Sequence, residues 1–481
     1  MENSRKQLHV VVFPWLAMGH LIPYHRFSIL LAQKGHKVSF VSTPRNLLNL
    51  PKIPPKLSSN ISLISLPLPS IPALPPNAET TTDIPYVKQQ LLKKAFDFLR
   101  SPLIAFLQKV KPDWVIYDYA SHWLPSIVAE LGISTAFFSL FNAATLSFIG
   151  PPSMLMNGGD LRLTAEDFTV VPKWVPFESN IAYRVHEVTK YVEKTEEDET
   201  GLTDSVRFGF AIGNADLVIV RSSPELEPEW FDLFGKLSQR PNIPIGFLPP
   251  LVEEENNNAD VGGWADIKEW LDKHEAKSVV YVALGTESAL TKKEVRELGL
   301  GLEKSSSPFF WVLRNSPEST QNVLEMLPDG FQERVKDRGI VYTRWAPQVN
   351  ILSHESVGTF LTHCGWNSVV EGLSFGKVLI LFPMLNDQGL NARLLHGKKL
   401  GLEIPRNELD GAFTSDSVAE LVRKSKVGSA DLADPIRGLF GDRGRNDRLL
   451  EGVVHYLEND TMSRLRASKS SLLCDSRVLF T

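Results

Sequence analysis

Short runs of continuously apolar residues recur along this chain, and segments with helical periodicity separate them. Leu8–Phe13 (LHVVVF), Trp114–Tyr117 (WVIY) and Ser278–Leu284 (SVVYVAL) are three such runs. Continuous apolar runs are typical of parallel strands that helices bury on both faces. Because each pair of parallel strands needs a crossover, usually a helix, the alternation predicts βαβ units and an α/β fold with doubly wound sheets.

A change of composition divides this alternation into two halves. The segment Pro241–Gly263 is rich in Pro, Asn and Glu and has no apolar periodicity, which is typical of an interdomain linker. The strand and helix pattern starts again after it. We therefore expect two Rossmann-like domains, residues 1–245 and 264–440, joined by a linker over residues 246–263. Ligands of such folds bind beyond the carboxyl ends of the strands, here between the domains.

The overall composition argues against several classes of protein. With 51 Lys and Arg against 56 Asp and Glu, the net charge is −5, which disfavours a nucleic-acid-binding protein. No apolar run approaches the roughly 20 residues of a membrane span. The first stretch, Leu8–Met18, has no small-residue cleavage site after it. Cys364 and Cys474, the two cysteines, make neither a disulfide framework nor a four-cysteine zinc site. We expect a cytoplasmic protein in a reducing compartment.

The block formed by residues 345–388 carries most of the chemical signal. A predicted strand ends at His363, and a helix is expected to start near Ser368. The exposed N–H groups and the dipole of a helix N-terminus suit a diphosphate, and Gly365 lets the backbone approach it closely. His363 and Asn367 add hydrogen-bonding groups, although His363 could also be a buried histidine with purely structural partners.

Other members of the block suit the remaining parts of a nucleotide sugar. Trp345 offers a flat face on which a base can stack, and Asp387 and Gln388 could bind sugar hydroxyls at the start of another helix. Each residue has a plainer explanation. Trp345 could belong to the core, and Ser368 and Glu371 have the spacing of a capping box. Taken together, polar groups at successive strand ends favour a binding site.

The block is similar to the signature box of plant UDP-sugar-dependent glycosyltransferases that act on small molecules. The family pattern is W-x-P-Q, then H-C-G-W-N-S, then E, and finally D-Q. The matching residues here are Trp345, Pro347, Gln348, His363, Cys364, Gly365, Trp366, Asn367, Ser368, Glu371, Asp387 and Gln388. The resemblance covers roughly residues 7 to 458 and implies the GT-B fold, with the donor held mainly by the C-terminal domain.

The resemblance also implies a set of UDP-sugar-binding residues. The implied contacts of uracil and ribose are Trp345, Gln348 and Glu371. The implied contacts of the diphosphate are His363, Asn367 and Ser368, with Thr286 in the segment VALGTES supplying a hydroxyl where the family has serine. The implied contacts of the donor sugar are Trp366, Asp387 and Gln388. Ala346 and Gly365 complete the set.

A histidine and an aspartate of the N-terminal half suit acid–base chemistry. His20 follows the first strand in a loop that should face the cleft, and a histidine can remove a proton from a hydroxyl near neutral pH. Asp118 follows the strand Trp114–Tyr117 and could orient that histidine where two strand ends meet. Each residue alone could be an ordinary loop or turn residue. In the similar family the matching pair is the catalytic dyad, which implies these roles for His20 and Asp118.

The resemblance further implies an inverting single displacement that uses a UDP-sugar as co-substrate and needs no cofactor or metal. The segments FPWLAMGHLIPY, KGHKVSFVSTPRN and KPDWVIYDYA are similar to the branch-forming subgroup, which adds sugar to the sugar of terpenoid, saponin and flavonoid glycosides. Gln388 implies glucose rather than galactose as donor sugar, with UDP-rhamnose and UDP-xylose left open. Tyr119, Ser139 and Asn142 follow predicted strands and could bind the acceptor, although loop polarity explains each singly.

Two other functions stay open: a transferase that acts on an aglycone, and a UDP-sugar-binding protein without catalysis. We expect a monomer. Residues 441–459 are expected to form a closing helix that packs back on the N-terminal domain, and the Ser- and Arg-rich residues 460–481 a flexible tail. The charged segment Glu187–Thr200 is expected to be a solvated helix.

Overall fold

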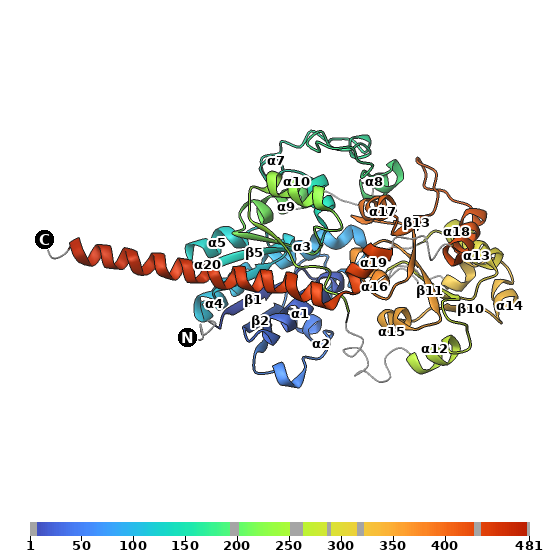
Figure 1. The fold of residues 1–481 in the computed structure, drawn as a ribbon, viewed down its shortest axis with the longest axis horizontal. Coiled ribbons are helices and arrows are strands. Elements are labelled where there is room, and N and C mark those ends of the chain that lie inside the picture. Colours follow the sequence, from blue (N-terminus) through green and yellow to red (C-terminus); the bar gives the residue numbers. More distant parts are fainter. Residues whose placement is uncertain are drawn as a thin grey trace.

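The computed structural model describes residues 7–192, 202–250, 263–285, 290–314, 322–427 and 434–478. Within these ranges the strands form two parallel sheets, one in each half of the chain (Figure 1). The first sheet comprises β1 (His9–Phe13), β2 (Lys37–Ser42), β3 (Ile61–Ser65), β4 (Trp114–Tyr117), β5 (Ser134–Ser139), β6 (Leu217–Val220) and β7 (Asn242–Pro244). The second comprises β8 (Val279–Ala283), β9 (Phe309–Val312), β10 (Gly339–Tyr342), β11 (Val357–Thr362), β12 (Val378–Leu381) and β13 (Gly401–Glu403).

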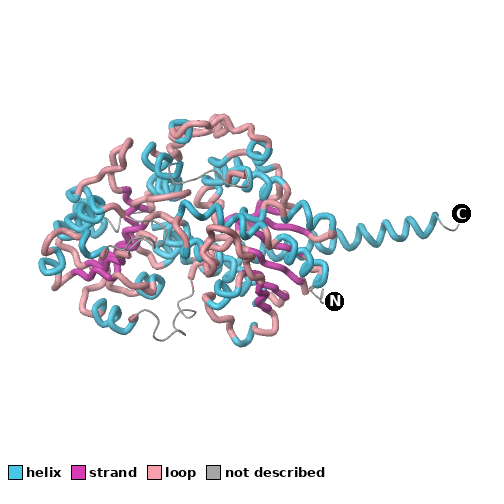
Figure 2. Tube along the Cα trace, turned by 180° about the vertical axis from the view of Figure 1, so that it is seen from behind, coloured by secondary structure: helices cyan, strands magenta, loops and turns pink. Residues whose placement is uncertain are grey.

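Helices cover both sheets and supply the crossovers that parallel strands require (Figure 2). The helices of the N-terminal domain are α1 (Met18–Gln33), α2 (Pro44–Leu48), α3 (Gln89–Asp97), α4 (Arg100–Val110), α5 (Leu124–Glu130), α6 (Ala143–Ile149), α7 (Pro152–Met156), α8 (Val185–Val192), α9 (Asp204–Gly213) and α10 (Pro228–Ser238). Those that follow are α12 (Trp264–Leu271), α13 (Lys292–Ser305), α14 (Phe331–Val335), α15 (Gln348–Ser353), α16 (Trp366–Ser374), α17 (Gln388–Gly397), α18 (Ser415–Val427), α19 (Asp434–Gly441) and α20 (Arg443–Val478).

Each sheet reverses its strand order at one place. The order is β3-β2-β1-β4-β5-β6-β7 in the first sheet and β10-β9-β8-β11-β12-β13 in the second. The reversal therefore falls between β1 and β4 in one domain and between β8 and β11 in the other. Crossovers leave to opposite faces of the sheet at such a point, which opens a crevice at the carboxyl ends of the two strands.

The apolar runs of the sequence form the sheets' two-sided cores. Alternate residues of β1 and β4 belong to different clusters, with Val11 and Val115 on one face and Val10 and Ile116 on the other. All four side chains are fully buried. Burial on both faces explains why these strands lack the apolar–polar alternation of a half-exposed sheet. The predicted fold of two doubly wound parallel sheets is confirmed.

The last helix leaves the C-terminal domain and runs along the N-terminal domain (Figure 1). Val453 and Leu457 of α20 join the core cluster of β1 and β4. Trp114 of β4 donates its indole N–H to the Leu457 carbonyl at 3.2 Å and to Thr461 Oγ1 at 3.0 Å. A closing helix was expected over residues 441–459, and the structure has one there. The boundary expected at residue 460 is wrong, because α20 continues to Val478 and Thr461 is buried.

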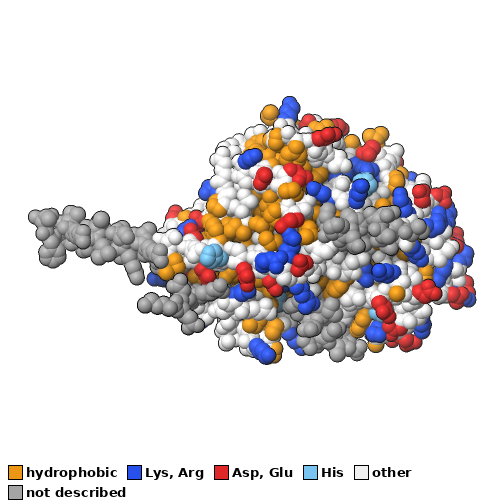
Figure 3. All heavy atoms as spheres, in the orientation of Figure 1, with side chains coloured by type: hydrophobic (Ala, Val, Ile, Leu, Met, Phe, Trp, Pro, Cys, Tyr) orange, Lys and Arg blue, Asp and Glu red, His pale blue; other side chains and the backbone are white. Residues whose placement is uncertain are grey.

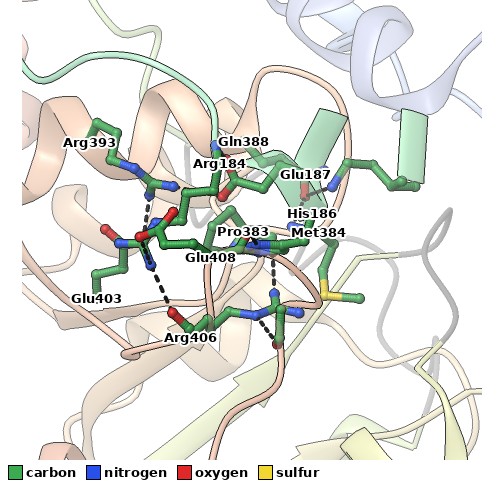
Figure 4. Close-up of polar contacts among 12 residues, drawn as sticks. Arg184, His186, Glu187, Pro383, Met384, Gln388, Arg393, Glu403, Arg406 and Glu408 are labelled. Atoms are coloured by element: carbon green, nitrogen blue, oxygen red, sulfur yellow. Dashed lines mark hydrogen bonds and ion pairs between the residues drawn. The ribbon is translucent and has the colours of Figure 1, made fainter. Parts of the chain in front are cut away.

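An ionic cluster joins the domains where α8 meets α17 (Figure 4). Arg393 of α17 donates to Glu187 of α8 at 2.8 Å and to Glu403 at 2.5 Å, and Arg184 lies 3.1 Å from Glu403. Burial raises the pKa of Glu187. The expectation of a solvated helix is therefore wrong at Glu187, while residues 193–200 lie outside the described residues.

The surface of the described residues is mixed in character. On the face in Figure 3, basic and acidic side chains are interspersed, and apolar side chains gather over α10. A cavity of about 450 Å³ in that region is lined by Pro224, Pro228, Phe231 and Pro244, among others. None of the described helices combines the length and apolar content that crossing a membrane requires.

Candidate active site

His20 and Asp118 meet at the switch point of the first sheet. β1 and β4 pair in register, with Phe13 opposite Tyr117, so the residues that follow them emerge side by side. His20 Nδ1 lies 2.6 Å from Asp118 Oδ2. A carboxylate only accepts hydrogen bonds, so the Nδ1–H donates and the basic lone pair of the ring is on Nε2. The predicted proximity of the two residues is confirmed, although His20 lies in the first turn of α1 and not in a loop.

The Asp118 carboxylate is held from several sides. Its Oδ1 accepts from the Tyr119 N–H at 2.8 Å, and its Oδ2 accepts from the Trp15 N–H at 3.2 Å. The side chain is 4% exposed, against 21% for His20. A buried, backbone-anchored carboxylate beside a more exposed imidazole is the arrangement that orients a general base.

The second switch point brings His363 between two glycines. Gly285 follows β8 and His363 follows β11, and these strands pair with Ala283 opposite Thr362. A Cβ on Gly285 would lie 2.9 Å from His363 Nε2, and one on Gly365 only 2.6 Å from it. Gly285 also has a φ of +80°, which favours glycine. Both positions therefore need a residue without a side chain. Thr286, the next residue, lies outside the described residues.

His363 is neutral at physiological pH. Burial lowers the pKa of its ring to about 4. Its Nδ1 is buried and has no hydrogen-bond partner among the described residues. A neutral imidazole still carries one N–H, so the residue can donate to a phosphate oxygen without adding a charge.

The helix that follows His363 begins without a side-chain cap. α16 starts at Trp366, two residues earlier than predicted, and its N-cap Gly365 makes no side-chain hydrogen bond. Ser368 lies in the first turn, so the capping box that its spacing allowed is not formed. The first N–H groups of α16 therefore remain available to an anion.

Ser368 and Glu371 are joined through Gln348 instead. Gln348 Nε2 donates to Ser368 Oγ at 3.0 Å and to Glu371 Oε2 at 2.8 Å. Burial raises the pKa of Glu371, although the bond from Gln348 and the charges of Arg26 and Arg221 lower it. These carboxylate and amide oxygens could accept the two hydroxyls of a ribose, which agrees with the predicted grouping of Gln348 with Glu371.

Trp345 does not belong to the core. Its side chain is 51% exposed, whereas the next residue, Ala346, is buried. A large exposed aromatic surface three residues before Gln348 is suited to stacking on a planar base. Burial of Ala346 leaves only its backbone to contact a ligand.

Trp366 and Asn367 differ from their predicted placement, because their side chains contact the other domain. The Trp366 indole is buried and donates to the Arg221 carbonyl at 2.8 Å, so it does not face a donor sugar. Asn367 Nδ2 donates to the Gly19 carbonyl at 2.7 Å, and its Oδ1 accepts from Arg221. The backbone groups of both residues and the second N–H of the Asn367 amide remain for the ligand.

Asp387 and Gln388 lie at the start of α17. Burial raises the pKa of Asp387 to about 6, although a hydrogen bond from Asn391 and the nearby His20 act in the opposite direction. Gln388 Oε1 accepts from the N–H groups of Met384 and Leu385 at 2.9 and 2.8 Å, which fixes its amide (Figure 4). The Gln388 NH₂ group is thereby oriented as a donor for sugar hydroxyls.

For two of the three residues predicted to bind the acceptor, the prediction is wrong. Ser139 is buried, and its hydroxyl bonds to the N–H and carbonyl of Phe141 at 3.1 Å, as a turn residue does. Asn142 is fully buried and caps α6 by accepting from the Thr145 N–H at 2.8 Å. Tyr119 does lie beside the dyad, with its ring centroid 6.1 Å from that of His20.

Two buried residues that hold side chains of this site were not predicted from the sequence. Arg221 bonds to Asn367, and burial lowers its pKa to about 9. Asn391 donates to Asp387 Oδ2 at 2.7 Å. Its position one helical turn after Asp387 was a usable signal, since residues four apart on a helix are neighbours. Arg221 carried no such signal. Among the described residues, no three His, Cys, Asp or Glu side chains are grouped as metal ligands.

Comparisons with known proteins agree with this geometry. Residues 260–426 match the family model described as "UDP-glucoronosyl and UDP-glucosyl transferase". UDP-glycosyltransferase 91C1 of Arabidopsis thaliana is 59% identical over 464 residues, which cover 95% of this chain and 98% of that protein. Soyasaponin III rhamnosyltransferase of Glycine max is 42% identical over 467 residues, covering 95% and 97%.

The fold is also similar to solved structures. The crystal structure of Glycyrrhiza uralensis UGT73P12 complexed with glycyrrhetinic acid 3-O-monoglucuronide superposes with a TM-score of 0.79 at 20% identity. The match covers 98% of this chain and 100% of that one. The predicted GT-B arrangement of two Rossmann-like domains is confirmed.

Proposed function

This chain belongs to the plant family 1 UDP-glycosyltransferases, and from that premise we propose that it transfers glucose from UDP-glucose to a hydroxyl of a small-molecule glycoside. The observation that carries the transferase part of the proposal is the bond between Asn367 of α16 and Gly19, the residue before His20. It places the candidate base next to the helix whose N-terminus would hold the diphosphate.

In the proposed mechanism His20 is the general base. Asp118 accepts the Nδ1–H at 2.6 Å, which leaves Nε2 to take the proton of the acceptor hydroxyl. The acceptor oxygen attacks the anomeric carbon as its bond to UDP breaks, so one displacement inverts the configuration. Asp118 stabilises the imidazolium that forms.

The departing diphosphate would be stabilised by the protein without a metal. The uncapped N–H groups of α16 and the neutral ring of His363 supply donors where negative charge develops. Gly285 and Gly365 give a phosphate room to approach that ring. Trp345 would stack on uracil, and Gln348 with Glu371 would bind the ribose.

The glycoside acceptor is supported by a relative rather than by the geometry. Soyasaponin III rhamnosyltransferase is named for a saponin, and saponins already carry sugar. The same name supports rhamnose as an alternative donor sugar. Gln388, with its amide fixed as a donor, supports glucose in this proposal.

A donor-by-acceptor screen tests the proposal. UDP-glucose, UDP-rhamnose and UDP-xylose are each offered with flavonoid, saponin and terpenoid monoglycosides and with the matching aglycones, and UDP release is measured. We expect the highest kcat/KM with UDP-glucose and a monoglycoside. Better use of the aglycones would replace the acceptor assignment. Binding of UDP-glucose without UDP release from any pair would favour a non-catalytic binding protein.

A further inference from the structure

Asn391 connects Asp387, which is assigned to the donor sugar, to the N-terminal domain. Its side chain is fully buried, and Nδ2 donates to Asp387 Oδ2 at 2.7 Å and to the Cys364 carbonyl at 3.0 Å. On its other side, Oδ1 accepts from Asn142 Nδ2 at 2.8 Å. Asn142 belongs to the N-terminal domain, so a chain of two amides runs from that domain to the Asp387 carboxylate.

We call this chain of two amides the relay. The groups at its two ends fix the orientation of both amides. Asn142 Oδ1 accepts from the Thr145 N–H at 2.8 Å, so only its NH₂ group can face Asn391. At the other end, the Asp387 carboxylate and the Cys364 carbonyl are acceptors, so they require the NH₂ group of Asn391. Both amides therefore have one orientation that satisfies every group, and flipping either would leave buried polar atoms facing like atoms.

Two more side chains of the N-terminal domain contact the turn that carries Asp387 and the helix α17 that follows it. Tyr86 donates its hydroxyl to Asn386 Oδ1 at 2.8 Å. Asn386, just before Asp387, has a φ of +55°, a conformation that asparagine tolerates better than most residues. Glu187 accepts from Arg393, further along α17, at 2.8 Å. The turn that carries Asp387 is thus bound to the opposite domain on several sides.

We propose that Asn391 is a positioning residue for the donor sugar: held by Asn142, it fixes the Asp387 carboxylate so that it accepts hydrogen bonds from the sugar hydroxyls. This inference rests on the proposed function. It assigns recognition of the donor sugar partly to the acceptor-binding domain, because the relay is complete only when the two domains are docked. Uridine and diphosphate are assigned to other residues, and Asn391 reaches them only through its bond to the Cys364 carbonyl, between His363 and Gly365.

A double-mutant cycle tests whether Asn391 acts through Asp387. Asn391→Leu keeps a similar shape and removes the amide. We expect it to lower kcat/KM for UDP-glucose by about 10- to 100-fold, the size usual for losing a hydrogen bond to a charged group. The Kd of UDP alone should change much less, because only the bond to the Cys364 carbonyl lies on that side. In an Asp387→Ala background, Asn391→Leu should have no further effect, whereas additive losses would overturn the proposal.

Two further variants separate positioning from general damage to the interface. Asn142→Asp keeps an N-cap for α6 but presents an acceptor to Asn391 Oδ1. It should reproduce the kinetics of Asn391→Leu, and wild-type kinetics would overturn the relay. Glu229→Gln is the matched control, because Glu229 pairs with Lys398 across the domains at the other end of α17, at 3.2 Å. A loss of donor kcat/KM in this control as large as that of Asn391→Leu would overturn the proposal.

A binding measurement tests the relay independently of the proposed transferase activity. Calorimetric titration with UDP-glucose and with UDP needs no acceptor and no turnover. Asn391→Leu should weaken UDP-glucose more than UDP. Equal weakening would overturn the relay even in an active enzyme, whereas an inactive wild-type chain with the expected difference would overturn only the proposed transferase activity.

Discussion

Asn367 of α16 donates its amide to the carbonyl oxygen of Gly19 at 2.7 Å, and Gly19 directly precedes His20. The Asn367 side chain is fixed from behind by Arg221. One hydrogen bond therefore separates the turn that carries the candidate base from the helix that would bind the diphosphate. The distance between base and donor is set when the domains dock, and not by either domain alone.

His20→Ala should lower kcat by about 10²- to 10⁴-fold, the usual contribution of a general base. The Kd of UDP, measured by calorimetry, should stay the same, because UDP would be held by the C-terminal domain. Asp118→Asn should also be slow, since it can stabilise the wrong tautomer of His20. Near wild-type kcat in either variant would contradict the dyad.

Trp345→Ala should weaken UDP binding by about 1–3 kcal/mol, if stacking here matches base–aromatic stacking elsewhere. The residue is 51% exposed, so the melting temperature should barely change. Calorimetry with UDP and thermal unfolding measure the two effects. An unchanged Kd would mean that the indole does not contact the base.

The donor-sugar contribution to binding should depend on pH through Asp387. Folding raises the pKa of this carboxyl from 3.8 to about 6. The folded state then binds the proton more tightly than the unfolded state. The free energy of unfolding therefore falls as pH rises from 3.8 to about 6 and Asp387 ionises. The ionised form is the one that accepts from sugar hydroxyls.

We therefore expect the Kd of UDP-glucose to rise as pH drops in the wild type relative to the Asp387→Asn variant, with a midpoint at about 6. Comparing the two proteins at each pH cancels the other titrating groups. Free UDP is not a suitable reference, because its own terminal phosphate gains a proton at about pH 6. A ratio of wild-type to variant Kd that stays constant across this range would contradict the role of Asp387.

Truncation should show what residues 461–464 of α20 contribute to stability. A stop codon after Asp460 removes Thr461, which accepts from Trp114 at 3.0 Å, and Arg464, which lies 3.2 Å from Asp216. Losing about 1 kcal/mol there should lower the melting temperature by about 2–4 °C. A stop codon after Arg464 is the control and should match the full chain. Equal melting temperatures for both truncations would mean that residues 461–464 add nothing.

The sequence was sufficient for features that one strand or one pair of neighbouring strands determines. Apolar runs predicted the sheets, and His20 and Asp118 meet because each follows a strand at the switch point. Residues whose partners lie in the other domain could not be placed. Asn142 was predicted to contact the acceptor, and its true partner could not be found because Asn391 is 249 positions away. The family resemblance implied a sugar contact for Trp366. No residue near it in the sequence shows that the Arg221 carbonyl accepts its indole N–H.

The path of the chain also limits how the domains can separate. It crosses from the first domain to the second after β7 and returns between α19 and α20, and the two crossings touch. Phe247 of the outgoing segment stacks on Phe440 of α19, with ring centroids 3.9 Å apart. Both rings are fully buried, so moving the domains apart at this place would unstack them and expose both to water.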